Sequence, residues 1–344
     1  MREYSLNDLR VALDFLDCND RQTWVRAALA LKCSYGEDAF AIWDDWSAGY
    51  GKYDPKVARN VWKSARAGKL TVGSIFKEAK DKGWIPDAAI QETEQIKRER
   101  AERAARRAAQ LAQEEIDLAR YHELIAGHSA EIFDRLYKVG TSKYLGDKGV
   151  QGYGVRFAHE PMLSVIRKDE ISAQLITDYA QIRKFLDEAN AIPRELRPYS
   201  FRHFKRGAFA VPMRDIDGKL WALQMIWPTG KKSYFYNGRK SGCMHIIGEI
   251  TPDVPCGIGE GYATMASVHA ATQWATVCAF DAGNLLSVAQ GFRGRYADQS
   301  IMICADNDVE TEGNPGVAAA TAAAQAIGAR ICIPDFAAVQ ARAA

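Results

Sequence analysis

The sequence lacks several features that would place the protein in a well-defined class. No stretch of about 18 uncharged apolar residues occurs, so nothing in it predicts a membrane-spanning helix. The N-terminus, MREYSLNDLR, has no apolar segment of the kind found in a secretory signal. We therefore expect a cytoplasmic protein with no membrane partner.

Other absences exclude particular chemistries. The seven cysteines form no C-x-x-C pair, so no zinc site or redox dithiol is expected, and we interpret them as reduced, buried thiols. The pattern G-x-x-x-x-G-K-[ST] is missing, which excludes a P-loop helicase or motor. The net charge is only +2, too small to identify a nucleic-acid partner, so local charge must decide.

Length and composition predict several domains. At 344 residues the chain is long enough for two or three cores. Residues 1–86 hold five of the eight tryptophans, at spacings that favour core packing in a small helical domain. Helix formers and glycine positions predict helices at about 6–16, 20–34, 37–48, 54–67 and 71–83.

A change of composition follows this helical domain. The run KRERAERAARRAAQLAQEE is dense in Ala, Arg and Glu and has few large apolar residues. We interpret residues 87–127 as a charged helical linker. Its arginines could contact phosphates, but the neighbouring glutamates offset much of their field, so a solvated linker is favoured.

The remainder divides into two parts with different patterns. Residues 128–250 are mixed α+β, and the segments GAFAVPMRD and KLWALQMIW around the DIDG turn predict a β-hairpin. Residues 251–344 alternate strands and helices, which predicts an open, mostly parallel sheet with helices on both faces. The expected fold class is therefore multidomain, α+β and α/β.

Four acidic residues stand at or just beyond the ends of the predicted parallel strands: Glu260, Asp281, Asp306 and Asp308. Ligands collect at this edge of such sheets, and carboxylate oxygens are the ligands that Mg²⁺ prefers. Asp281 is equally well explained as a helix N-cap. Asp306 and Asp308 flank one residue and repel each other unless a cation lies between them, so we favour a metal site there.

A dinucleotide site is the alternative for the run GIGEGY. Its third glycine comes one place early, and Glu260 would face a pyrophosphate. Cofactor binding of this kind is therefore disfavoured.

Three motifs in order carry a family resemblance. The runs GEGYATMASV, AFDAGNL and ICADNDVETEGNPG make residues 254–335 similar to the Toprim domain of DNA primases from bacteria, phages and plasmids. The resemblance implies that Glu260, Asp306 and Asp308 are the catalytic, metal-binding acids, with Mg²⁺ or Mn²⁺ as cofactor and with Gly283 and Asn284 shaping the site. Many primases carry a further acid near the position of Thr264, which leaves the metal stoichiometry open.

Upstream segments resemble the basic half of a primase core. They are SKYLGDKGV and FAVPMRDIDGKLWALQMIWPTGKKSYFYNGRKSG, and the resemblance implies side chains that hold template and nucleotide phosphates. Lysines beside Tyr234, Phe235 and Tyr236 would add base stacking. The alternative is a solvated hairpin tip with core aromatics behind it. The implied residues are Lys143, Lys148, Arg214, Lys231, Lys232, Arg239 and Lys240.

The first 85 residues resemble the helical domain that accompanies primases of phages and plasmids, through DRQTWVRAALALK, WDDWSAGYGKYD and GKLTVGSIFKEAKDKGW. This implies a replication protein of a mobile element. The zinc module of cellular primases is absent. The sequence stops soon after the last expected strand, where relatives continue, so a truncated Toprim domain is one interpretation.

Three functional hypotheses follow. The first is a primase that joins ribonucleoside triphosphates on a single-stranded DNA template, with a replicative helicase as a further candidate partner. The second is a Toprim nuclease that uses the same metal to cut strands, and the acids alone do not separate the two. The third is a non-catalytic module that binds single-stranded DNA or recruits a helicase.

Overall fold

The computed structural model describes residues 6–49, 51, 53–64, 71–85, 94–307, 311 and 313–335. Its internal contacts divide the chain into two compact units, residues 1–113 and 114–344. Among the described residues, no helix is long and apolar enough to cross a membrane.

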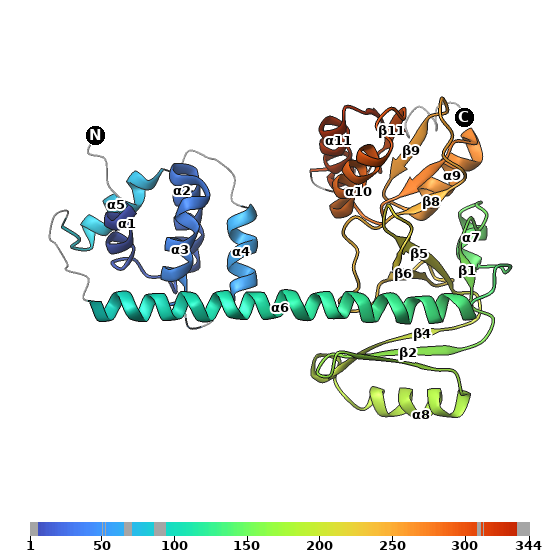
Figure 1. Ribbon diagram of the computed structural model, residues 1–344, viewed down its shortest axis with the longest axis horizontal. Coiled ribbons are helices and arrows are strands. Elements are labelled where there is room, and N and C mark those ends of the chain that lie inside the picture. Colours follow the sequence, from blue (N-terminus) through green and yellow to red (C-terminus); the bar gives the residue numbers. More distant parts are fainter. Residues whose placement is uncertain are drawn as a thin grey trace. The chain divides into compact units, whose positions relative to one another are not determined.

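The first unit contains the five helices expected from the sequence (Figure 1). The residues just before two of them act as N-caps. Asp20 accepts hydrogen bonds from the backbone N–H of Gln22 and Thr23. Asp54 accepts them from Lys56 and Val57, with Pro55 as the first helical residue. The helices are α1 (Leu6–Leu13), α2 (Arg21–Tyr35), α3 (Phe40–Ser47), α4 (Pro55–Ser64) and α5 (Val72–Asp81), with a 3₁₀ turn, η1, at Gly36–Ala39.

Tryptophans form the centre of this unit. The ring centroid of Trp43 lies 4.9 Å from that of Trp24 and 5.5 Å from that of Trp62, and all three side chains are buried. Trp24 Nε1 donates to Ser47 Oγ at 2.8 Å, which satisfies a buried donor. The interpretation of these residues as core is confirmed.

A single helix, α6, runs over Glu94–Arg135. The predicted linker ended at residue 127, whereas the helix continues beyond it. Its last turns are not solvated, because Tyr121, Ile125, Ile132 and Phe133 are buried in the main core of the second unit. The charged part of the pattern therefore stops before the helix does.

The predicted hairpin is confirmed within a four-stranded antiparallel sheet, ordered β1-β5-β6-β7. Asp215 closes the turn by accepting hydrogen bonds from the backbone N–H of Asp217 and Lys219. The strands are β1 (Arg156–Phe157), β5 (Phe209–Arg214), β6 (Leu220–Ile226) and β7 (Lys232–Ser233); the short helix α7 (Lys143–Asp147) precedes them.

A second antiparallel sheet, ordered β3-β2-β4, was not expected from the sequence. Helix α8 (Tyr179–Asn190) covers one face through Ile182, which packs with Leu163 and Val165. Met162 and Ile166 join the main core instead, as strand alternation requires. The strands are β2 (Met162–Arg167), β3 (Ser172–Ile176) and β4 (Tyr199–Phe204), and a 3₁₀ turn, η2, lies at Arg194–Leu196.

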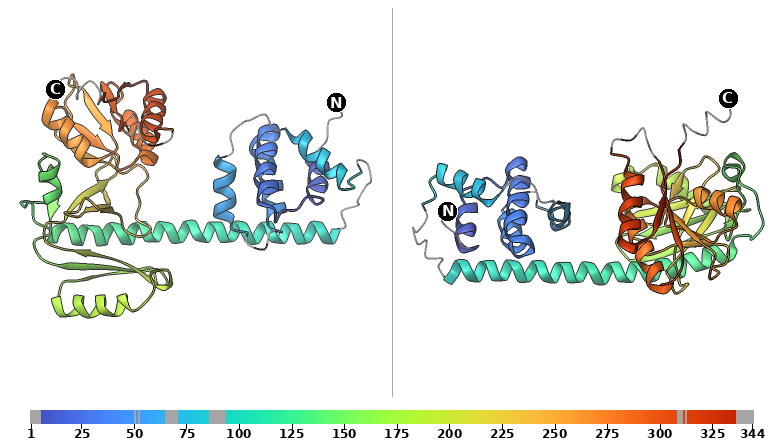
Figure 2. Two further views of the ribbon diagram at one scale, coloured as in Figure 1. Left: turned by 180° about the vertical axis from the view of Figure 1, so that it is seen from behind. Right: turned by 90° about the horizontal axis from the view of Figure 1, so that it is seen from above.

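The third sheet has the predicted alternation of strands and helices. Its order is β12-β11-β9-β10-β8, parallel except for β8. Helix α9 lies across the sheet from α10 and α11 (Figure 2). The elements are β8 (His245–Ile247), β9 (Cys256–Gly259), α9 (Tyr262–Thr272), β10 (Thr276–Cys278), α10 (Ala282–Arg295), β11 (Ile301–Cys304), α11 (Pro315–Ile327) and β12 (Arg330–Cys332).

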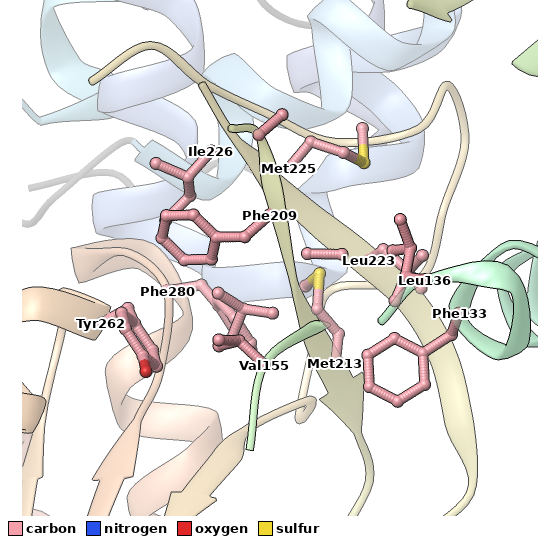
Figure 3. Packing of buried hydrophobic residues seen from close by; sticks show 14 of the residues in the cluster. Phe133, Leu136, Val155, Phe209, Met213, Leu223, Met225, Ile226, Tyr262 and Phe280 are labelled. Atoms are coloured by element: carbon pink, nitrogen blue, oxygen red, sulfur yellow. The ribbon is translucent and has the colours of Figure 1, made fainter. Parts of the chain in front are cut away.

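One core joins the hairpin sheet to this parallel sheet. Figure 3 shows Phe133 of α6 and Leu136, just after this helix, in the same cluster as Phe209 of β5 and Tyr262 of α9. The ring centroids of Phe209 and Tyr262 are 5.9 Å apart. The two sheets therefore fold as parts of one unit.

The prediction of uniformly buried thiols is wrong in part. All seven cysteines are free, but Cys33 and Cys332 are exposed and Cys18 is half-buried. Cys332 is exposed because β12 is an edge strand. The buried thiols are Cys243, Cys256, Cys278 and Cys304.

Candidate active site

Strand pairing places two of the predicted acids at one edge of the parallel sheet. Gly259 of β9 is opposite Cys304 of β11, so Glu260 and Asp306 come one and two residues beyond a paired position. Thr264, in the first turn of α9, lies with its Oγ1 3.3 Å from Asp306 Oδ1. The threonine near which the family resemblance led us to look for a further acid thus contacts an acid of the site.

Glycines at the starts of α9 and α11 let the backbone approach these acids. A methyl group at Gly316 would lie 3.3 Å from Glu260 Oε1 and only 2.4 Å from the carbonyl oxygen of Asp306. One at Gly261 would lie 3.9 Å from Asp306 Oδ2. The first turn of α11 therefore meets both acids, and only glycine fits there.

The third predicted acid, Asp308, lies outside the described residues. Over the part of the chain that the structure describes, no group of three or more His, Cys, Asp or Glu residues forms a metal cluster. The donors that are described suit a hard divalent cation, because Glu260 Oε1 is a buried carboxylate oxygen close to the backbone at Gly316. The neighbouring Cys278 is a poor metal ligand, because burial raises the pKa of its thiol to about 12 and keeps it neutral.

Asp281 has the role that the alternative interpretation gave it. Its Oδ1 accepts a hydrogen bond from Asn284 N at 3.0 Å, which caps α10, and its other oxygen pairs with Lys240. The preceding residue, Phe280, has φ +74°, a strained conformation for a bulky residue. Strain of this size is held only where surrounding contacts determine the backbone, here at the end of β10.

Asn284 connects the parallel sheet to the segment before β8. Its Nδ2 donates to the carbonyl oxygens of Cys243 at 2.8 Å and Ala279 at 2.9 Å, and its Oδ1 accepts from Gly242 N at 2.8 Å. Gly283 is exposed beside it. These contacts give Asn284 a structural role, and nucleotide binding by the two residues stays a prediction.

Four of the seven predicted basic residues contact an acid or a backbone carbonyl oxygen. Lys143 pairs with Asp147 at 2.5 Å, and Arg214 Nη1 donates to the carbonyl oxygen of Gly218 at 2.8 Å. Arg239 lies 4.0 Å from Asp215 and, as noted, Lys240 pairs with Asp281. Within the described ranges, the exposed residues Lys148, Lys231 and Lys232 have no carboxylate within 4.0 Å. Of the seven predicted basic residues, these three lysines are therefore the best placed to bind a phosphate.

The three aromatic residues after Lys232 differ in environment. Phe235 is buried, as the core alternative expects, whereas Tyr236 is 36% exposed. Tyr234 is half-buried: its Oη accepts from Gln224 Nε2 at 2.6 Å and donates to the carbonyl oxygen of Phe280 at 3.3 Å. Burial raises the pKa of Tyr234 to about 12, so it remains a neutral phenol.

Sequence reasoning missed Arg202, in the unexpected sheet. Its Nη2 donates to the carbonyl oxygen of Tyr234 at 2.8 Å, and its Nε lies 2.5 Å from Ser233 Oγ. Burial is the main cause that lowers its pKa, yet an arginine stays charged in proteins. Arg202 thus fixes the backbone directly after Lys231 and Lys232. No local pattern in the sequence predicts this contact, because Arg202 and Ser233 are 31 positions apart in the chain.

Comparisons with known proteins identify one family in the N-terminal helical region and another in the region of the parallel sheet. The family described as Primase C terminal 2 (PriCT-2) matches residues 9–79, and the Toprim domain family matches residues 256–338. Two proteins of Escherichia coli, both named DNA primase TraC, are 40% identical to this chain over 134 residues. That match covers 37% of this chain but only 13% and 9% of those proteins.

Two solved structures are also similar. The DnaG primase catalytic domain bound to single-stranded DNA has 16% identity and a TM-score of 0.37, with 64% of this chain and 74% of that chain covered. A DNA primase domain from Pseudomonas aeruginosa has 17% identity and a TM-score of 0.33, with 55% and 61% covered.

Proposed function

Because the chain carries a PriCT-2 domain and a Toprim domain and is related in sequence to DNA primases, we propose that it is itself a DNA primase, which joins ribonucleotides on a single-stranded DNA template. The observation that carries the proposal is the placement of Glu260 and Asp306 at the carboxyl ends of adjacent parallel strands, inside the Toprim match. A primase of a phage, plasmid or other mobile element accounts best for the PriCT-2 domain.

Toprim primases generally use a divalent metal, and we propose Mg²⁺ here. Glu260 and Asp306 would hold it together with Asp308. When bound, such an ion neutralises the charge that develops on a phosphoryl group as a phosphodiester bond forms. The chain's own part is to hold the two described carboxylates in place: Thr264 contacts Asp306, and the backbone at Gly316 packs closely against both acids.

The basic segment Lys231–Lys240 supplies the proposed phosphate contacts. Lys231 and Lys232 attract template or nucleotide phosphates, since they are exposed and no acid is paired with them in the described ranges. Tyr234 links this segment to the end of β10 through Phe280. A replicative helicase stays a proposed partner, because a primer is needed where a duplex is being opened.

The test is primer synthesis on single-stranded DNA with labelled ribonucleoside triphosphates and Mg²⁺. We expect Asp306→Asn to lower synthesis by at least about 100-fold, because charge stabilisation by a bound metal is worth several kcal/mol. Asp298→Asn is the matched control: Asp298 is exposed and precedes β11, at the opposite end of that strand, so synthesis should not change.

Other outcomes would overturn the proposal. Metal-dependent cutting of the template without synthesis would establish the nuclease hypothesis instead. Binding of single-stranded DNA with neither reaction would leave a non-catalytic module. Equal synthesis by Asp306→Asn and the wild type would show that the acids are not the site.

A further inference from the structure

Two aromatic rings stack on each other at the surface of the second unit. The ring centroids of Tyr137 and His159 are 4.3 Å apart and their planes differ by 8°. Tyr137 is 46% exposed and His159 is also exposed. Neither side chain belongs to a core cluster. A stacked pair has two outer ring faces, and this exposure leaves room for a third ring.

The backbone beneath the pair is braced on both sides. Tyr137 N donates to the carbonyl oxygen of Phe157 at 3.0 Å, and Phe157 N donates back at 2.8 Å. Ala158, next to His159, exchanges hydrogen bonds with Ala208 and Gly207 at 2.9 and 3.2 Å. The rings are therefore carried on fixed backbone near β1, so little ordering entropy is lost when a ligand stacks on them.

Three exposed cations lie near the pair, either next to it in the chain or in a turn bonded to the backbone beside it, and the exposed Glu160 follows His159. Lys138 follows Tyr137, and Lys205 and Arg206 form the turn that the Gly207–Ala158 hydrogen bond places beside His159. All three are exposed, and no carboxylate of the described residues lies within 4.0 Å of them.

Two nearby arginines, unlike these three cations, are paired with acids. Arg135 pairs with Glu131 at 3.6 Å, and Arg156 pairs with Asp134 at 3.2 Å. Val139, two residues after Tyr137, is 81% exposed and adds apolar surface. Open cations beside free ring faces suit an anionic ligand that has flat rings of its own.

We propose that Tyr137 and His159 form a stacking platform for an unpaired base of a single-stranded nucleic acid, with Lys138, Lys205 and Arg206 contacting its phosphates. Base stacking on aromatic side chains tolerates any sequence, whereas a duplex hides its base faces. The assignment of the strand as template DNA rests on the proposed function. The platform extends the contacts of that strand beyond the acids and the basic segment Lys231–Lys240.

The experiment measures the Kd of the full chain for a labelled 20-nucleotide single strand, without nucleotides or metal. We expect the double variant Tyr137→Ala, His159→Ala to raise Kd by about 5- to 150-fold, because stacking contributes about 1–3 kcal/mol per base. Tyr137→Phe keeps the ring and should stay within twofold. Tyr179→Ala removes a tyrosine that is 67% exposed on α8 and is the matched control.

Charge gives a second, independent test. The triple variant Lys138→Gln, Lys205→Gln, Arg206→Gln keeps both rings and changes only exposed positions. It should reduce the slope of log K against log salt by about 2, as loss of three single-strand phosphate contacts predicts. A 2-aminopurine base in the strand should be quenched by the wild type and not by the double alanine variant.

The outcomes separate the platform from the proposed enzyme. An unchanged Kd in the double variant, or an equal loss of affinity for duplex DNA, would overturn the platform even if primers are made. Loss of single-strand affinity in a chain that makes no primers would support the platform and count against the primase. Thermal unfolding of each variant checks that the fold is kept.

Discussion

Replacing Gly316 by alanine tests whether the first turn of α11 really shapes the acid site. The new methyl group would start 2.4 Å from the carbonyl oxygen of Asp306, a distance that real side chains do not show. Asp306 or the helix must therefore move by more than half an ångström. Because the same methyl group lies 3.3 Å from Glu260 Oε1, this shift acts on both carboxylates at once.

The magnitude follows from two opposing effects. Overpacking a well-filled site costs about 1–3 kcal/mol, whereas alanine is favoured over glycine within a helix by about 1 kcal/mol. We expect a net loss of up to about 2 kcal/mol in the free energy of unfolding of the parallel sheet. Affinity for Mg²⁺ should fall as well, because metal binding by few protein ligands depends on their placement.

The first assay is urea-dependent hydrogen exchange in α10 and α11, which measures the stability of the parallel sheet separately from that of the N-terminal helical unit. The second is calorimetric titration of the protein with Mg²⁺. Gly291→Ala is the matched control: Gly291 lies on α10 with open space around its α-carbon, so alanine should stabilise by about 0.5–1 kcal/mol. Equal stabilisation by both substitutions, with Mg²⁺ affinity unchanged, would refute the geometry argued for Gly316.

Three further predictions concern groups around the site. Arg202→Lys should increase hydrogen exchange at Ser233 and Tyr234, because a single ammonium cannot replace the guanidinium contacts to both residues; unchanged exchange would refute the clamp. Asp281→Ala should destabilise α10 by about 1 kcal/mol in urea unfolding through loss of its N-cap. Burial lowers the pKa of His245 to about 4, below the ordinary 6.5, so its stabilising contribution is complete above pH 6.5 and is lost as the pH falls towards 4. His245→Asn should therefore flatten the dependence of unfolding free energy on pH in that window, by about 3 kcal/mol at most.

The parallel sheet could be predicted from the sequence because its signals are local. Each strand from β9 to β12 is a short apolar run, and α10 begins after Asp281, which the sequence already offered as an N-cap. Once the strands are parallel, their carboxyl ends must share an edge, which placed Glu260 and Asp306 together. The five helices of the first unit were equally readable, since tryptophans at helical spacing mark their buried faces.

The three-stranded sheet and the full length of α6 could not be predicted in this way. Strands β2 and β4 are neighbours although more than 30 residues separate them, and no short-range pattern encodes that pairing. In α6, buried residues such as Tyr121 and Ile125 follow a charged run on one continuous helix, so composition suggested a boundary where the backbone has none. The stacked pair of Tyr137 and His159 was missed for the same reason, because β-pairing through Phe157 brings them together.

Contacts between the two larger sheets determine how the acids and the basic segment can act together. Tyr234 reaches the carbonyl oxygen of Phe280, Lys240 pairs with Asp281, and Asn284 binds the backbone of Cys243. All three contacts meet the parallel sheet within six residues of the end of β10. A bound phosphate chain would therefore be held by one continuous piece of structure, in which Lys231 and Lys232 keep a fixed relation to the strand ends. This explains why the strained backbone of Phe280 is tolerated there: its carbonyl oxygen accepts the hydrogen bond from Tyr234 that joins the segment after β7 to the parallel sheet.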